Sequence, residues 1–300
     1  MKRKVIKQAN QAYTLTLPID WVRKNNISEK SEVDVEIIEK SLVINSSNPV
    51  AGGKAKIDVS NLDPKNIYRH ISALYAKGID EIELISDKDV SSDIISYLNQ
   101  MMGYALVEQK NNIYKIKDVK AGQYQDLDEI FKRVFQMVLL FYDSLVNDVF
   151  EKEKETLESL KNRDLEVNKF CLYLQRAINK SSYPDIIKGR ALFTYSFALE
   201  KIGDEIQRLW RTAIKYKIKK CPLLKELTVL SCEGLGKSFE FYYQFNPKKI
   251  EEIYRIRDNV RKKSMDLLKI DSHTARFVRH AVKIMEDAAD LSHLTLMMKL

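Results

Sequence analysis

Pairs of carboxylates four residues apart are the feature of this sequence best suited to chemistry. Glu200 and Asp204 form one pair, and Glu286 and Asp290 form a second pair 86 positions later. On an α-helix such residues share a face about 6 Å apart, where like charges oppose helix formation by a few tenths of a kcal/mol. A bound divalent or iron-type cation would offset this repulsion, because carboxylates combined with an imidazole such as His293 suit these ions.

Neighbouring helices can add oxygen ligands to each pair. Asp164 and Asn168, again four residues apart, precede the first pair, and Asp258 precedes the second. The position four residues after Asp258 is Lys262, whose ammonium group would damage the second site. The sequence therefore predicts metal ligands at Asp164, Asn168, Glu200, Asp204, Asp258, Glu286 and Asp290.

An internal repeat separates these pairs from chance occurrences of Glu-x-x-x-Asp, which on most surface helices are simply solvated or paired with Lys and Arg. Placing residues 199–210 over 285–296 aligns both acid pairs and also matches the small residues Gly203 and Ala289. Repetition within one chain predicts two copies of one structural unit. His293 taken alone is better explained as a surface or capping residue.

Long amphipathic segments from Asp126 onward must position the acid pairs. The pattern predicts helices over 126–149, 151–180, 185–217, 222–244, 247–270 and 272–299, interrupted at Pro184, Pro222 and Pro247. In the third helix, steps of three and four residues form the seam of an antiparallel bundle: Leu192, Tyr195, Leu199, Ile202, Ile206, Leu209 and Ala213. We expect two tandem three-helix bundles, over residues 126–220 and 222–300.

Two smaller units precede the helices. Residues 54–119 follow a β-α-β-α-β-β order, which predicts a small α/β domain whose sheet is covered by two helices on one side. This domain has no Gly-rich phosphate loop, so we interpret it as a scaffold or a dimerisation layer. Residues 1–47 read as four short strands around one helix, and residues 45–53 form a linker. So small a unit needs a partner subunit or the rest of the chain to bury its apolar face.

Positive charge is concentrated at the amino terminus. The chain carries 50 Lys and Arg against 42 Asp and Glu, a net charge of +8, and up to Lys24 six basic side chains face Asp20 alone. Such an excess predicts contacts with DNA phosphates, for which the candidates are Arg3, Lys4, Lys7, Arg23 and Lys24. A terminus that only solubilises a dimerisation module is the alternative, since no recognition helix for base contacts is visible.

Two other basic clusters, over residues 211–220 and 248–263, are typical of solvated helix faces. A docking surface for an acidic partner is the alternative for both. The three cysteines, Cys171, Cys221 and Cys232, fit neither a disulfide framework nor a zinc site, and we expect buried thiols. The longest apolar runs are far shorter than the roughly 20 residues that cross a bilayer, so we expect a cytoplasmic protein without membrane insertion.

The helical part resembles PhoU, a family of phosphate-signalling regulators. Glu200-Lys201-Ile202-Gly203-Asp204 and Glu286-Asp287-Ala288-Ala289-Asp290 look like its two E-x-x-x-D signatures, and 164–168 resembles an acidic motif on a preceding helix. The resemblance implies two three-helix bundles related by pseudo-symmetry, with metal clusters on the acidic faces. It also implies phosphate-transport or signalling proteins as partners.

Residues 3–25, RKVIKQANQAYTLTLPIDWVRKN, are similar to the SpoVT/AbrB swapped-hairpin module, with its strand, loop, strand, Leu-Pro and helix signature. This resemblance implies a homodimer whose interleaved hairpins present basic side chains to DNA. Archaeal PhoU-like regulators join such a module to a PhoU region through a small α/β segment, so the two resemblances together cover nearly the whole chain.

Three hypotheses for function follow. The first is a dimeric, non-enzymatic regulator of phosphate uptake that binds DNA through residues 1–47 and proteins through the bundles, with or without metal. The second is an interaction protein without DNA affinity that docks on a phosphate transporter or a signalling kinase. The third is a carboxylate-bridged metalloenzyme, which the sequence disfavours because the paired Glu-x-x-His ligands of di-iron bundles are absent.

Overall fold

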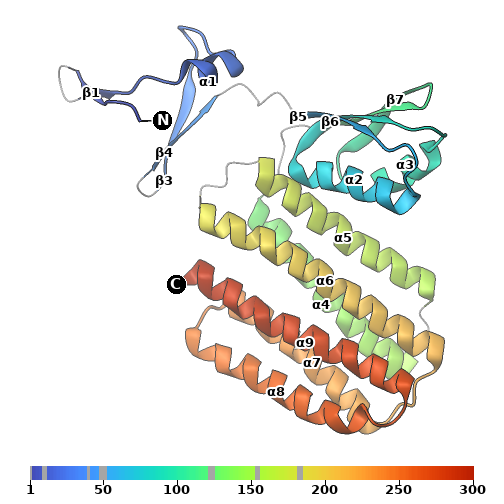
Figure 1. Cartoon of the computed structure of the whole chain (residues 1–300). Coiled ribbons are helices and arrows are strands. Elements are labelled where there is room, and N and C mark those ends of the chain that lie inside the picture. Colours follow the sequence, from blue (N-terminus) through green and yellow to red (C-terminus); the bar gives the residue numbers. More distant parts are fainter. Residues whose placement is uncertain are drawn as a thin grey trace. The chain divides into compact units, whose positions relative to one another are not determined.

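The computed structural model describes residues 2–8, 12–38, 41–46, 53–120, 126–152, 156–180 and 185–300 (Figure 1). The chain divides into two compact units, Met1–Gly53 and Lys54–Leu300. Most of the predicted linker at 45–53 lies outside the described residues, as do Pro184 and residues 9–11 of the amino-terminal loop.

The first unit consists of two short hairpins and one helix. Strands β1 (Ile6–Lys7) and β2 (Tyr13–Thr14) pair antiparallel, helix α1 spans Ile19–Lys24, and β3 (Val33–Ile38) pairs antiparallel with β4 (Ser41–Ser46). None of its described side chains is buried, and large apolar ones face outward; Ile37 is 80% and Tyr13 66% exposed. The described residues of this unit therefore form no core of their own, as its small size predicts.

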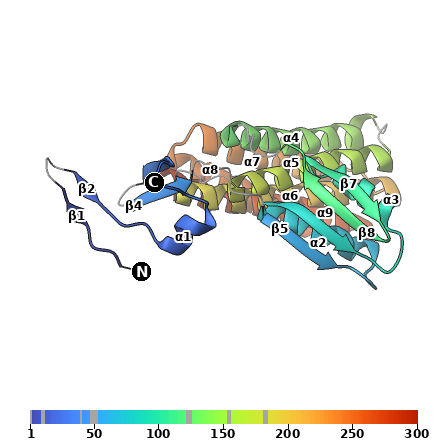
Figure 2. The ribbon, with the colours of Figure 1, turned by 90° about the horizontal axis from the view of Figure 1, so that it is seen from above.

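The second unit begins with the predicted α/β domain. Its elements are β5 (Gly53–Asp58), α2 (Pro64–Lys77), β6 (Ile79–Ile85), α3 (Ser91–Leu98), β7 (Tyr104–Lys110) and β8 (Ile113–Asp118), and the strand order is β5-β6-β8-β7. Figure 2, which looks down from above, shows these strands side by side. The expected β-α-β-α-β-β order is confirmed. Helix α3 ends at Leu98, and the chain then turns and buries Met101.

Both helices of this domain cover the same face of the sheet. Ile71 of α2 and Ile94 of α3 share one buried cluster with Ile82 of β6 and Tyr114 of β8. The opposite face carries ion pairs between neighbouring strands, such as Lys56 with Glu83 at 2.6 Å. Because side chains alternate along a strand, this pattern gives a sheet with one apolar and one solvated face.

Six long helices make up the rest of the second unit and confirm the predicted tandem bundles. The first bundle contains α4 (Leu127–Asn147), α5 (Leu157–Lys180) and α6 (Ile186–Tyr216); the second contains α7 (Pro222–Tyr243), α8 (Ile250–Leu267) and α9 (Ser272–Lys299). The predicted start of the second helix at residue 151 is wrong, because Asp148–Lys152 continue α4 as a π-helical turn. No helix among the described residues is long and apolar enough to cross a membrane.

The two bundles pack side by side around one continuous apolar core. Helices α5, α6, α9 and α8 lie next to one another in that order, with α4 and α7 behind them (Figure 1). The predicted seam residues of α6, from Leu192 to Leu209, are fully buried, and Ala213 is partly buried. Cys171 is buried, Cys221 and Cys232 are partly buried, and all three are free thiols.

Close packing inside the second bundle depends on Gly234 of α7. A Cβ atom there would overlap Sδ of Met285 on α9 and lie 3.2 Å from Cγ2 of Ile256 on α8. Gly236, one half-turn further along the same helix, has open space around its Cα. Only the first of these two glycines therefore holds three helices together.

We expect Gly234→Val to lower the free energy of unfolding by about 1–3 kcal/mol, the usual cost of overpacking a filled core. Urea denaturation followed by circular dichroism measures it. Gly236→Val is the matched control and should change stability by less than about 0.5 kcal/mol. Adding Met285→Ala to Gly234→Val should recover part of the loss, since it vacates the overlapping volume. Equal effects of the two glycine substitutions would contradict the packing argument.

Candidate functional site

The seam between the bundles shows how the repeated acid pairs are arranged. The Tyr195 hydroxyl donates to the carbonyl of Leu291 at 2.8 Å, Glu205 Oε2 lies 2.6 Å from His280 Nδ1, and the Tyr216 and His273 rings stack 4.2 Å apart. Residue numbers thus rise along α6 as they fall along α9, so the two helices are antiparallel.

This pairing places Glu200 and Glu286 at the same level of the seam, because each lies midway between two of those contacts. Two copies of one helix that pack antiparallel are related by a two-fold axis. Equivalent residues of the two copies lie at the same level only where this axis passes between the helices. The sequence repeat and the packing therefore describe the same duplication. Each glutamate also faces the middle helix of its own bundle, α5 for Glu200 and α8 for Glu286.

The first acid set consists of Asp164, Asn168, Glu200 and Asp204, and it contains two oxygen atoms that lack a hydrogen-bond partner. Asp164 is only 7% exposed, and both its Oδ1 and the Oδ1 of Asn168 are buried without a partner. Across the α5–α6 contact, Glu200 Oε2 lies 3.0 Å from Lys201 Nζ, and Asp204 Oδ2 accepts from Arg208 at 2.9 Å. Orphaned buried oxygens are costly, so they mark this set as a candidate site.

The electrostatics of Asp164 follow from this placement. Burial raises its pKa, and the negative charges of Asp204 and Glu200 raise it further, to about 6, although Arg211 and Arg208 oppose the shift. A carboxylate whose pKa is raised by burial and by like charges is typical of functional sites.

Helix α2 of the α/β domain lies at this acid set. Burial raises the pKa of Tyr68 on α2, and the charges of Glu200 and Asp164 raise it further. The ring of Tyr68 also packs edge-on against Tyr97 of α3, with centroids 5.3 Å apart. The α/β domain therefore brings a phenol group close to the acids of the first bundle.

The second acid set, which consists of Asp258, Glu286 and Asp290, contains an arginine among its carboxylates. Arg261 of α8 donates through Nε to Glu286 Oε1 at 2.9 Å, and its Nη1 lies 3.8 Å from Asp258 Oδ1. Arg257 also binds Asp258, at 2.9 Å. A guanidinium group thus neutralises two of the three carboxylates predicted as ligands, Asp258 and Glu286, so these residues do not fit a metal. Lys262, which the sequence indicated as the interfering cation, is exposed.

The first set fits a cation better than the second, because Asp164 and Asn168 offer unpartnered oxygens. Among the described residues, however, no three His, Cys, Asp or Glu side chains are grouped closely enough to hold a metal ion. Glu200 and Asp204 would have to leave Lys201 and Arg208 to complete such a site. The predicted metal ligands of the first set therefore remain a prediction.

Asp290 and His293 turn toward the seam between the bundles. With Asp287 of α9 and Lys201 and Glu205 of α6, they line a hollow of about 530 Å³. Asp290 thus shares a surface with α6, whereas Glu286 contacts α8. His293 is exposed, in agreement with its interpretation as a surface residue.

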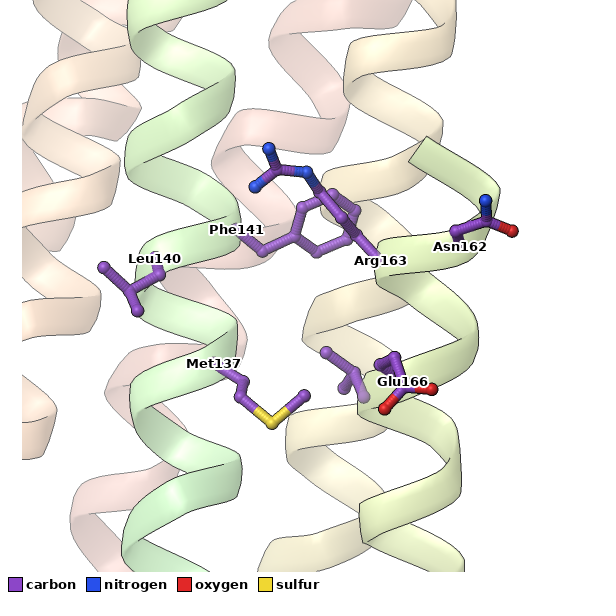
Figure 3. Close-up of a pocket in the computed structure, with 7 residues that line it drawn as sticks. Met137, Leu140, Phe141, Asn162, Arg163 and Glu166 are labelled. Atoms are coloured by element: carbon purple, nitrogen blue, oxygen red, sulfur yellow. The ribbon is translucent and has the colours of Figure 1, made fainter. Parts of the chain in front are cut away.

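An apolar hollow of about 370 Å³ opens between α4 and α5 (Figure 3). Met137, Leu140 and Phe141 form its α4 side, and Arg163 and Glu166 stand at its α5 side. Leu140 is 64% exposed at the rim of this hollow. A partly open apolar surface of this kind is typical of a protein-contact site.

The predicted DNA-binding residues are all exposed and come from two places in the first unit. Arg3 and Lys4 precede β1, Lys7 belongs to β1, and Arg23 and Lys24 form the last turn of α1. Their exposure leaves them available for phosphate contacts, which the structure by itself does not test.

Comparisons with known proteins bear on each unit separately. Residues 6–51 match the family model described as "Antidote-toxin recognition MazE, bacterial antitoxin". The first unit is MazE-like. The match spans every strand of this unit and supports the sequence resemblance to a swapped-hairpin module, whose fold belongs to the same broad class. None of the curated proteins matches the chain.

A solved structure is similar to part of the chain. It is titled "Crystal structure of the phosphate transport system regulatory protein PhoU from Streptococcus pneumoniae". The identity is 17% and the TM-score 0.45, over 56% of this chain and 89% of that one.

Three features of the site were missed by sequence reasoning. Tyr68 reaches the first acid set from another domain, Arg261 neutralises the second, and His280 binds Glu205 across the seam at 2.6 Å. Each partner lies at least 25 residues away along the chain, as in the case of Arg261 and Glu286. Of these three features, only the role of Arg261 had a local signal in the sequence, because Arg261 follows Asp258 by three residues on the same helix.

Proposed function

We propose that the protein is a dimeric, non-enzymatic regulator of phosphate uptake. The MazE-like module binds DNA, and the tandem bundles contact the phosphate transporter or its signalling proteins in the cytoplasm. The observation that carries this proposal is the duplication of the E-x-x-x-D pairs at equivalent positions of two bundles, Glu200 and Glu286 each facing its own middle helix. This arrangement, joined to a MazE-like module, is the one that the resemblance to PhoU-like regulators implies.

The dimer is supported by the exposed apolar surface of the MazE-like module. Ile6, Tyr13, Val35, Ile37 and Leu42 are each at least 55% exposed. Side chains of this kind in a unit without a buried core need cover, and a second copy of the module supplies a complementary surface. Dimerisation also doubles the basic side chains that face one duplex.

Cation binding at the first bundle is part of the proposal. Asp164, Asn168, Glu200 and Asp204 would hold the ion, and its charge would stabilise the ionised form of Asp164. No cation is proposed at the second bundle, because Arg261 supplies the positive charge there.

DNA binding is expected to be strongly salt-dependent. Fragments upstream of phosphate-transport genes should bind, and affinity should fall as salt rises, with a slope of about 0.9 in log–log terms for each phosphate contact. Arg3→Gln/Lys4→Gln/Lys7→Gln should weaken binding about tenfold or more and flatten that slope. Gel shifts at two salt concentrations measure both quantities.

The matched control for this test is Lys161→Gln/Lys262→Gln/Lys269→Gln, which removes the same charge from exposed positions on the bundles. It should leave DNA affinity within about twofold of the original. Equal weakening by both triple variants would indicate a general charge effect, and no salt-sensitive binding to any fragment would reject the DNA-binding half of the proposal.

A second candidate function is an interaction protein without DNA affinity. The apolar hollow between α4 and α5 favours it, since Leu140 and Met137 present a contact surface (Figure 3). In that case the bundles would retain transporter or kinase proteins in a pull-down, Leu140→Asp would abolish this retention, and gel shifts would remain negative.

A further inference from the structure

The end of α6 and the turn that follows it form a basic segment. The ten residues from Arg211 to Lys220 include five basic side chains and no acidic one, and all five are exposed: Arg211, Lys215, Lys217, Lys219 and Lys220. Lys217 has a left-handed backbone, with φ 45° and ψ 57°, where the helix ends. Arg211 and Lys215 therefore share one face of the last turns of α6, and Lys217, Lys219 and Lys220 lie at the turn that ends it.

Part of this positive charge is not neutralised by the described carboxylates of the second unit. Among the residues that the structure describes, none of Lys215, Lys217 and Lys219 forms an ion pair with a carboxylate. In the other basic cluster, on α8, Arg257 pairs with Asp258 and Arg261 pairs with Glu286. The cluster at the end of α6 keeps Lys215, Lys217 and Lys219 available for a partner.

A hollow of about 440 Å³ with a mixed lining opens beside these lysines. Its lining combines the aliphatic side chains of Val149, Ala213, Ile214 and Ile218 with Asp148, Lys217 and Lys220. Asp148 is buried and accepts from Trp210 Nε1 at 2.7 Å, so its charge is already engaged inside the bundle. The hollow thus presents an apolar floor and a lysine rim.

An acidic protein segment fits both parts of this surface. Its carboxylates would pair with Lys217 and the nearby Lys219, and one bulky apolar side chain would fill the floor, as in interfaces where a buried anchor is surrounded by polar contacts. A nucleic acid would satisfy the lysines through its phosphates but has no aliphatic anchor for Ile214 and Ile218.

We infer that the hollow bounded by Val149, Ile214, Ile218, Lys217 and Lys220 is a docking site for an acidic protein segment that inserts one bulky apolar side chain. The inference rests on the proposed function in that it assigns the protein-contact role to a particular surface of the first bundle. It is independent of whether the MazE-like module binds DNA.

Selection from a random peptide library tests the inference directly. The full-length protein is panned against phage-displayed peptides of roughly twelve residues, and the enriched peptides are synthesised with a fluorescent label and titrated by anisotropy. Enriched sequences should carry several Asp or Glu around one Phe, Leu or Trp. Replacing the acids with their amides, or the apolar residue with Ala, should weaken binding about tenfold or more.

Two variants locate the site. Lys217→Glu/Lys219→Glu should weaken the enriched peptides about tenfold or more, and Ala213→Leu, which fills the hollow, should also weaken them. Lys248→Glu/Lys249→Glu is the matched control, because it reverses the same charge near α8, and it should leave affinity within about twofold. Circular dichroism establishes that each variant is folded.

The outcomes separate this inference from the proposed function. Enrichment of neutral or basic peptides, or equal weakening by the two charge-reversal variants, would overturn the docking site. Binding of a short DNA duplex that is lost in Lys217→Glu/Lys219→Glu would also overturn the docking site, because that result would assign the lysines to nucleic acid. Gel shifts with promoter fragments should be unchanged by this variant, so a failure of DNA binding would reject the proposed function and leave the docking result unaffected.

Discussion

Replacing Arg176 with Met is expected to lower the free energy of unfolding of the second unit by about 3–5 kcal/mol, the usual cost of breaking a buried ion pair. Arg176 of α5 is fully buried. It donates to the backbone carbonyls of Tyr75 and Ile79 at 2.9 and 2.7 Å, and to the carboxylates of Asp80 and Asp118. The substitution would remove one charged donor from two carboxylates and two carbonyls, although Lys180 would still bind Asp80.

The guanidinium group of Arg176 is also held between aromatic rings. Its Cζ lies 4.9 Å from the ring centroid of Tyr75 and 5.0 Å from that of Tyr104, and the two rings meet edge-on. This geometry requires a planar donor with several N–H groups, so Arg176→Lys should still lose a large part of the stability. Because the partners named here all belong to the α/β domain, the residue joins that domain to the first bundle.

Urea denaturation followed by far-ultraviolet circular dichroism measures this loss. Arg133→Met is the matched control, since Arg133 is exposed and its guanidinium lies over a single ring, that of Phe170, at 4.7 Å. It should change stability by less than about 1 kcal/mol. A loss no larger than the control's would contradict the role assigned to Arg176, and separate melting of the α/β domain in the Met variant would support it.

Periodicity was sufficient to predict most elements of the fold. The apolar steps of α6 identified its buried face from Leu192 to Leu209, and alternation in residues 54–119 gave the strand and helix order. These signals are local, because each helix or strand must place its apolar side chains on one face. The contact of Arg176 with Asp80 joins residues 96 positions apart and leaves no local pattern.

The acid sets show the same limit at the level of single residues. Spacing along α8 indicated Lys262, four residues after Asp258, as the cation that damages the second site, yet Arg261 is the residue that binds Glu286. One residue on a helix corresponds to a rotation of about 100°, so the choice depends on how α8 packs against α9, which its own sequence does not encode. Tyr68 was not predicted for the same reason, since α2 reaches the first acid set only through the packing of the α/β domain on α5.

The first acid set reduces stability at neutral pH, and this cost can be measured. Burial and the charges of Asp204 and Glu200 raise the pKa of Asp164 from 3.8 to about 6. The folded protein therefore binds this proton more tightly than the unfolded chain does. Stability from Asp164 is highest below pH 3.8, falls as the pH rises through the interval up to about 6, and stays low above it.

Asp164→Asn should therefore raise the free energy of unfolding at about pH 7 by about 2 kcal/mol, after allowance for solvent screening. The gain should disappear near pH 4, where the native carboxyl is already protonated. Asp266→Asn, at a side chain that is 81% exposed, is the matched control and should show no such pH-dependent gain. Urea denaturation at several pH values measures all three proteins.

A stabilising substitution at a buried position indicates that the native residue serves a purpose other than folding. Cation binding supplies such a purpose, because an ion beside Asp164 and Asn168 would favour the ionised carboxylate and use their unpartnered oxygens. Adding Mn²⁺ at about pH 7 should then stabilise the native protein by RT ln(1 + [Mn²⁺]/Kd), about 2.7 kcal/mol at 100 times Kd, and should leave Asp164→Asn unchanged. Equal stabilisation of both proteins would assign the metal effect to another surface. If Mn²⁺ stabilised neither protein, cation binding would be removed from the proposed function. The loss of stability caused by Asp164 would then be explained by its place beside the α/β domain.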